Sequence, residues 1–166
     1  MTGKTHASCG CLIGMYFAKD YGVSLESVVI LSAAVTGAVV PDICHTKSYI
    51  GRRLPIVSFI FSIIFGHRSF THSLLFLLLN FMILDIIGVP TVFIVSYTVG
   101  ILSHLILDMI TKTGVSLFYP LKKRISLPIY FKTGGIVDYL LFFVFIGMSY
   151  YCLLYTSDAA DDIALV

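Results

Sequence analysis

Two histidines, an arginine and three hydroxyl side chains stand together in residues 66–73 (GHRSFTHS), between two strongly apolar runs. Imidazole nitrogens bind divalent metals, and the planar guanidinium of Arg68 can clamp a phosphate or a carboxylate. His67 and His72 are five residues apart, so a regular helix would point them in different directions. They converge from a loop or a bent helix start, or they serve different roles. Arg68 has a second interpretation as a charge that faces lipid headgroups and anchors a helix.

A second candidate pair lies inside a long apolar segment. His104 and Asp108 are four residues apart, which places an imidazole and a carboxylate on one helix face. This spacing suits two ligands to one metal, or a histidine and the carboxylate that orients it. The alternative is a polar pair that holds two helices together. Ionisable groups inside a membrane span are costly, which favours a functional role.

Asp42 and His45 form a weaker pair, three residues apart and just after Pro41. An aspartate after proline is often a cap or turn residue. Taken together, five histidines and two aspartates at polar breaks predict a mono- or dinuclear metal centre. Nitrogen and oxygen donors suit zinc, which we rank first, and also manganese or iron. The predicted ligands are His6, Asp42, His45, His67, His72, His104 and Asp108, and the catalytic candidates are Asp42, Asp108 and Arg68.

The composition indicates that lipid is the solvent. Of the 166 residues, 58% are hydrophobic and 12% are charged, against about 45–50% apolar and 25% charged in soluble domains. The four cysteines have neither the paired spacing of a metal site nor that of a secreted disulfide framework. Membrane lipids are the predicted partners, and no nucleic-acid partner is predicted.

The hydropathy pattern predicts an all-α fold, a polytopic transmembrane helical bundle of about four to five spans. A span needs about 20 apolar residues, so the segment 54–65 is too short and is predicted to be re-entrant or interfacial. A polar, basic connection covers residues 112–133. The predicted apolar helices are 5–19, 25–41, 73–88, 91–110 and one that begins at 136 and runs through 151.

The distribution of Lys and Arg residues predicts the orientation of the chain in the membrane. If 5–19, 25–41, 73–88 and 91–110 cross the membrane, ten of the eleven Lys and Arg residues fall on one side, and Lys19 alone falls on the other. The positive-inside rule makes the basic side cytoplasmic. The same assignment places all five histidines at or near the cytoplasmic face, although it was made without them. The run 122–124 is interpreted as a lipid-surface and topology signal.

The C-terminal segment of the chain is interpreted separately from the rest. Residues 152–162 read CLLYTSDAADD, which looks like the translation of a transposon-end sequencing adaptor. We therefore predict one transmembrane helical domain over 1–151 and a non-native tail over 152–166.

Several spaced blocks resemble the YdjM-type family of bacterial inner-membrane proteins, which are LexA-regulated and described as metal-dependent hydrolases. The resemblance runs from Met1 to about residue 145. It is carried by Thr5-His6, VPDICHTKS at 40–48, FGHRSFTHSLL at 65–75, LSHLILDMIT at 102–111, Gly114-Val115 and Tyr119-Pro120.

The resemblance implies that the seven predicted ligands form one polar site and that the protein is a bacterial inner-membrane hydrolase. This chain has Cys44 where the family has the second aspartate of Asp-x-Asp-His. It also has Ser69 in place of a common glycine, and Asp138 in place of a glutamate. Cys44 either binds a soft metal as a thiolate or marks the weakening of a second metal.

The sequence thus predicts a membrane-bound hydrolase whose cytoplasm-facing metal site cleaves an ester or phosphoester, possible substrates including a lipid. The first alternative is a metal-ion transporter that uses the same histidines and aspartates. It requires polar residues that continue through the spans. The second is a non-catalytic membrane protein with polar pairs between its helices.

Overall fold

The computed structural model describes residues 1–65, 69–121 and 123–164, with side chains as far as residue 155. This part of the chain is helical, apart from isolated bridges between Thr111 and Phe131 and between Val115 and Ile125. The longer helices are α1 (Gly3–Ala18), α2 (Leu25–Val39), α4 (Pro55–Phe65), α5 (Leu74–Ile86), α6 (Thr91–Met109) and α7 (Ile136–Ala164). The short ones are α3 (Tyr49–Arg53) and the 3₁₀ turns η1 (Lys19–Tyr21), η2 (Val40–Cys44) and η3 (Phe70–His72).

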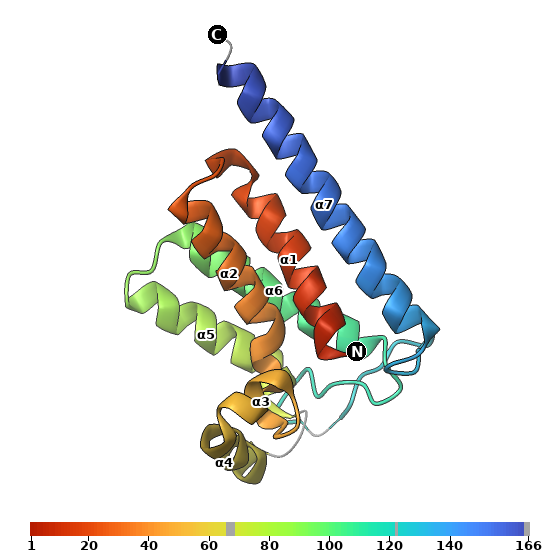
Figure 1. Cartoon of the computed structure of the whole chain (residues 1–166). Coiled ribbons are helices and arrows are strands. Elements are labelled where there is room, and N and C mark those ends of the chain that lie inside the picture. The colour runs from red at the N-terminus through yellow and green to blue at the C-terminus, as the bar shows by residue number, and fades with distance from the viewer. Residues whose placement is uncertain (66–68, 122, 165–166) are drawn as a thin grey trace.

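The helices α1, α2, α5 and α6 form a bundle, with α2 between α1 and α6 and with α5 packed on α6 (Figure 1). Helix α7 runs along α1 and extends beyond the bundle at its C-terminal end (Figure 1). The N-terminus, α3, α4 and the connection after α6 gather at the opposite end of the bundle (Figure 1). The segments that the charge pattern placed on one side of a membrane therefore lie at one end of the molecule.

Three segments are long and apolar enough to cross a membrane: Leu25–Cys44, Thr91–Met109 and Ile136–Tyr155. Helices α1 and α5 have 16 and 13 residues, which is short of the roughly 20 residues that a span needs. Length and composition thus support three of the four to five predicted spans. Helix α4, with 11 residues, is short, as predicted.

The helix boundaries follow from local capping. Ser24 caps α2, because its side chain accepts a hydrogen bond from the backbone N–H of Ser27 at 3.2 Å, and the Ser27 hydroxyl accepts one from the N–H of Ser24 at 3.2 Å. Pro41 stands at the start of η2, where the α-helix tightens into a 3₁₀ turn that carries Asp42. Ser73 caps α5 in the same way as Ser24 caps α2.

Two glycines allow the helices α2 and α6 to pack closely against each other. A Cβ atom on Gly37 would overlap the carbonyl oxygen of Tyr97, and one on Gly100 would overlap the carbonyl oxygen of Ala34. Small residues let membrane helices approach until their backbones touch. This close approach matters for the site, because Ala38 and His104 lie on the same α2–α6 interface.

Replacing Gly37 with alanine is expected to lower stability by about 1–3 kcal/mol, because α2 and α6 must move apart to admit the methyl group. Thermal unfolding of the detergent-purified protein measures the effect. Gly147→Ala in α7 is the matched control, since its Cβ would meet no atom within 4 Å. Equal melting temperatures for the two variants would show that the helix contact is looser than described.

Candidate metal centre

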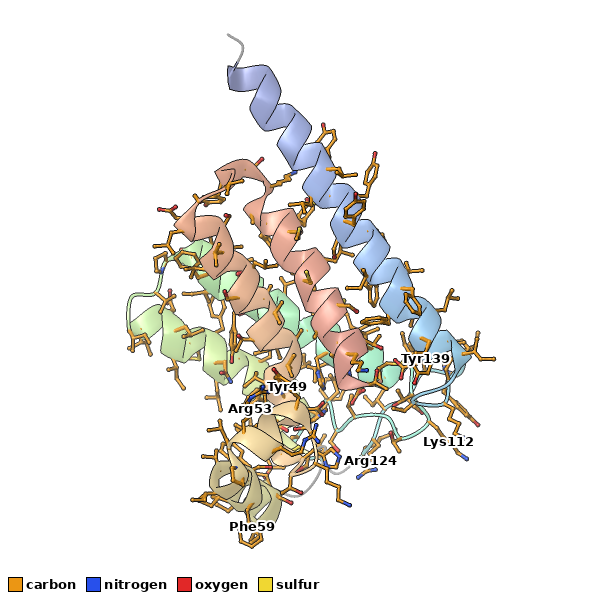
Figure 2. All side chains as sticks on the ribbon, in the orientation of Figure 1. Tyr49, Arg53, Phe59, Lys112, Arg124 and Tyr139 are labelled. Carbon is orange, nitrogen blue, oxygen red and sulfur yellow. The ribbon has the colours of Figure 1, made fainter. Side chains whose placement is uncertain are left out.

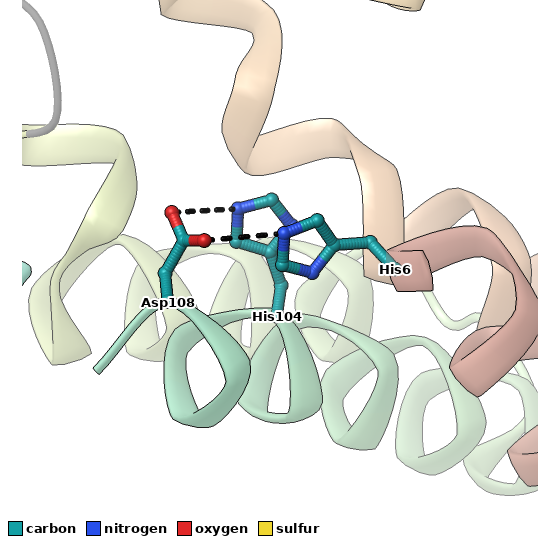
Figure 3. A group of neighbouring side chains, drawn as sticks. All are labelled: His6, His104 and Asp108. Carbon is teal, nitrogen blue, oxygen red and sulfur yellow. Dashed lines mark ion pairs between the residues drawn. The ribbon is translucent and has the colours of Figure 1, made fainter. Parts of the chain in front are cut away.

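Five of the predicted ligands converge at the basic end of the bundle. His6 comes from the first turns of α1, Asp42 from η2, His72 from η3, and His104 and Asp108 from the last turns of α6. The three histidines and Asp108 are at most 1% exposed, whereas the Asp42 side chain is 16% exposed. Figure 3 shows the His6, His104 and Asp108 side chains pointing toward one another from α1 and α6. A buried cluster thus has one partly open edge, at Asp42.

Two imidazole nitrogens of this cluster lie close to each other and to two carboxylate oxygens. The Nε2 atoms of His72 and His104 lie 3.2 Å apart. Oδ1 of Asp42 lies 3.7 Å from Nε2 of His72 and 3.9 Å from Nε2 of His104. Oδ2 of Asp108 lies 3.6 Å and 3.9 Å from the same two nitrogens.

These spacings fit one divalent ion. Donors at about 2.0–2.2 Å from a tetrahedral ion lie roughly 3.3–3.6 Å from one another, close to the 3.2–3.9 Å that separate the two imidazole nitrogens from each other and from the two carboxylate oxygens. Neutral imidazole and carboxylate are also the donors that zinc, manganese and iron accept. We refer to Asp42, His72, His104 and Asp108 as the four-donor set.

Outer contacts fix how the two imidazoles point. Nδ1–H of His104 donates to the carbonyl oxygen of Ala38 at 2.7 Å, which leaves Nε2 as the nitrogen that faces the cluster. Nδ1 of His72 lies 3.0 Å from the Thr71 hydroxyl, and its Nε2 also faces inward. Such second contacts select the tautomer and orientation of a metal-binding histidine. The Ala38 carbonyl and Thr71 were not foreseen, and only the position of Thr71 beside His72 hinted at its role.

The other oxygen of Asp108 is held from the opposite side. Oδ1 accepts a short hydrogen bond from the amino group of Met1 and lies 3.2 Å from Nε2 of His6. The His6 ring stacks on His104, with ring centroids 3.8 Å apart and planes inclined by 17°. Nδ1 of His6 is buried and has no hydrogen-bond partner among the described residues. His6, His104 and Asp108 form a second group with metal-ligand spacing, which shares two residues with the four-donor set.

The charge of the cluster affects His72. Burial disfavours its imidazolium form, but the contact with the carboxylate of Asp42 outweighs burial and raises the pKa of His72 to about 9. In the metal-free protein at pH 7, the imidazole is therefore protonated. The positive charge of the protonated His72 imidazole then occupies the place that a bound metal cation would take.

Metal binding at pH 7 is consequently expected to release about one proton from His72, since a ligating imidazole must be neutral. The apparent affinity should rise about tenfold per pH unit from pH 7 toward 9 and level off above it. Titration calorimetry in buffers with different ionisation enthalpies measures the released proton. The same binding heat in every buffer would contradict the assigned protonation state.

The remaining predicted residues are outside this cluster. His45 is exposed and belongs to neither group of metal-ligand spacing. His67 and Arg68 lie outside the described residues. Cys44 is buried, with its sulfur 4.0 Å from Nδ1 of His72. It therefore lies near the Nδ1 edge of that imidazole, whereas the Nε2 atom faces the four-donor set.

Asp138 has a supporting role that the sequence alone did not reveal. Its carboxylate accepts hydrogen bonds from the backbone N–H of Thr2 at 3.0 Å, from that of Gly134 at 2.7 Å, and from the Thr5 hydroxyl. These contacts hold the start of α1 against the first turn of α7. Because Thr5 precedes His6, they also position His6 beside Asp108. In the sequence, this role is indicated by the position of an aspartate at the start of an apolar helix.

With this geometry established, the similarity to known proteins can be stated. The sequence model of the family described as YdjM inner membrane protein matches residues 1–160. The chain belongs to the YdjM family. The resemblance seen in the sequence blocks is thereby confirmed.

Two relatives place the chain within the YdjM family. The protein YvsG of Bacillus subtilis (strain 168) is 43% identical over 141 residues, which are 85% of this chain and 87% of that protein. The inner membrane protein YdjM of Escherichia coli (strain K12) is 40% identical over 111 residues, or 64% of this chain and 57% of that protein. The chain thus matches little more than half of the Escherichia coli protein. No solved structure matches this chain.

Proposed function

We propose that this YdjM-family protein is a membrane-bound, metal-dependent hydrolase that cleaves an ester or a phosphoester. The observation that carries the proposal is the four-donor set, in which the Nε2 atoms of two buried histidines lie 3.2–3.9 Å from each other and from one carboxylate oxygen each of Asp42 and Asp108. Uncompensated polar groups are costly inside a membrane protein, and a bound cation offsets this cost. A buried polar pair between helices would not need donors from three separate segments, η2, η3 and α6.

The chain's own residues would share the work as follows. When bound, a divalent ion supplies a Lewis acid that lowers the pKa of water and steadies negative charge on the ester. Asp42, the partly exposed carboxylate, would accept the proton that the attacking water loses. Asp108 would be held in position by His6. Arg68 would bind the anionic group of the substrate with its planar guanidinium.

The number of donors bears on the identity of the metal. Zinc was ranked first from the sequence, but four protein donors would fill its tetrahedral shell, and a catalytic ion needs an open position. A six-coordinate ion would keep two positions for water and substrate. The four-donor set therefore favours manganese or iron for hydrolysis, with zinc as the alternative.

The proposal includes a multi-pass topology with the site at the cytoplasmic face of the bacterial inner membrane. Its support is the positive-inside rule, together with the gathering of the N-terminus, α3, α4 and the connection after α6 at one end (Figure 1). In that topology α1 and α5 cross alongside α2 and α6, and the shorter helices are accommodated by local thinning of the bilayer.

Metal analysis followed by a hydrolysis screen tests the function. The detergent-purified protein is expected to hold near-stoichiometric manganese, iron or zinc and to hydrolyse a nitrophenyl ester or phosphoester. His72→Ala should lose both, whereas His45→Ala, a histidine change outside the four-donor set, should keep the metal. A protein without metal even after reconstitution would refute the hydrolase. Bound metal without any hydrolysis would favour the metal-ion transporter.

A further inference from the structure

Helix α4 is the apolar element that the bundle leaves uncovered. Its large side chains are widely exposed, including Ile56 at 74%, Phe59 at 59% and Ile63 at 68%, and Ser58 is its one buried residue. It lies outside the bundle, at the end that holds the metal centre (Figures 1 and 2). At 11 residues, it is about 16 Å long and cannot cross a hydrocarbon core of about 30 Å.

The segment before α4 is basic. Lys47, Arg52 and Arg53 are exposed, and Asp42 of the four-donor set is the one acidic residue between Glu26 and Asp85. The guanidinium of Arg53 stacks on the ring of Tyr49, with Cζ 3.7 Å from the ring centroid (Figure 2). Stacking uses the face of the guanidinium and leaves the N–H donors at its edge for an anion. Exposed positive charge therefore borders exposed apolar surface.

The helix is tied to the segment that carries Asp42. A Cβ atom on Gly51 would lie 2.9 Å from the Ser58 hydroxyl and would overlap the carbonyl oxygen of His45, so α3, α4 and the turn at His45 are closely packed. Helix α4 also packs on η2. Beside α4 is an open apolar hollow of about 430 Å³, lined by Thr46, Pro55, Ile56 and Phe59. Thr46 follows Asp42 by four residues, so the hollow is linked through a short segment to the partly exposed carboxylate of the metal centre.

We propose that the hairpin of α3 and α4 binds anionic phospholipid, with α4 lying in the cytoplasmic leaflet and with Arg52 and Arg53 holding the phosphate of the headgroup. The apolar hollow offers a contact surface for an acyl chain, and the guanidinium groups of the two arginines can bind the phosphate. This inference rests on the proposed function, for which it names the substrate class: an anionic phospholipid whose ester reaches the metal centre past Asp42.

Lipid binding by the full-length, detergent-purified protein tests the headgroup contact. The probes are fluorescent phosphatidylglycerol and phosphatidylcholine with identical acyl chains. Wild type should bind phosphatidylglycerol at least tenfold more tightly. The double variant Arg52→Gln/Arg53→Gln should lose about tenfold or more of this preference, since each basic residue near an anionic surface contributes about fivefold.

Lys19→Gln is the matched control. Lys19 is also exposed and lies over a tyrosine ring, Tyr16, at 4.9 Å, but at the opposite end of the bundle. It should keep the preference for phosphatidylglycerol. An unchanged preference in the arginine double variant, or no preference in wild type, would overturn the proposal. Metal content of the same samples separates this failure from failure of the proposed function, because metal binding does not depend on the arginines.

A tryptophan reporter tests where α4 lies. The chain contains no tryptophan, so Phe59→Trp introduces a single tryptophan on the exposed face of α4, and its emission can be excited selectively at wavelengths that tyrosine does not absorb. In reconstituted bilayers, phospholipids brominated on the acyl chains should quench its emission relative to unbrominated lipids. Emission unaffected by bromine would place α4 outside the leaflet and overturn the proposal.

Discussion

The substitution His104→Ala is expected to empty the metal centre, with a loss of metal affinity of more than 100-fold. His104 belongs to both groups of metal-ligand spacing, and its Nε2 lies 3.2 Å from that of His72. Loss of an outer contact alone costs about 10–100-fold in metal affinity, so loss of a donor should cost more. Metal content after purification in the presence of manganese, iron or zinc measures the effect.

The neighbouring Ser103→Ala is the control for this substitution. The Ser103 hydroxyl donates to the carbonyl oxygen of Gly100 within α6 and belongs to neither group. This variant should keep its metal and its melting temperature. Retention of stoichiometric metal by His104→Ala would rule out the four-donor set and leave a polar network between helices as the role of the cluster.

The substitution Asp108→Asn is expected to lower the free energy of unfolding by about 3 kcal/mol in the metal-free protein and to prevent metal binding. Its carboxylate contacts His6, His72, His104 and the amino group of Met1 in a fully buried setting. An amide of the same shape removes the negative charge and leaves buried cations without compensation. Unfolding in mixed micelles with increasing dodecyl sulfate measures the loss.

Asp85→Asn provides the same chemical change at an exposed position of α5. Because the side chain is exposed, its stability should change by about 0.5 kcal/mol or less. If the two variants unfold at the same dodecyl sulfate concentration, the contacts of Asp108 contribute no more than those of an exposed aspartate. The prediction that the Asp108 carboxylate compensates buried positive charge in the cluster would then be wrong.

Much of the helical framework could be predicted, because apolar runs and caps are local signals. Ser24, Pro41 and the break before residue 91 mark boundaries that the structure keeps within a few residues. The number of spans was harder to predict. Helices α1 and α5 have span-like composition but stop short, and how far each one inserts depends on its neighbours in the bundle.

The site could be predicted in part, for a similar reason. The spacing of His104 and Asp108 correctly places both on one helix face, with donor atoms 3.9 Å apart. The 3₁₀ turn η3 brings in His72, while the alternatives for His67 and His72 stay predictions because His67 lies outside the described residues. His6 carried no local signal, because its partner Asp108 is 102 residues away, and His45 shares a block with Asp42 yet is exposed.

The attachment of α1 to both α6 and α7 has a consequence for biosynthesis. Asp108 and Asp138, which hold the start of α1 in place, are synthesised more than a hundred residues after His6. Early helices must therefore enter the membrane with an unfinished polar end, and the metal centre can be completed only after α7 has been inserted. A nascent chain arrested before α7 should therefore remain metal-free.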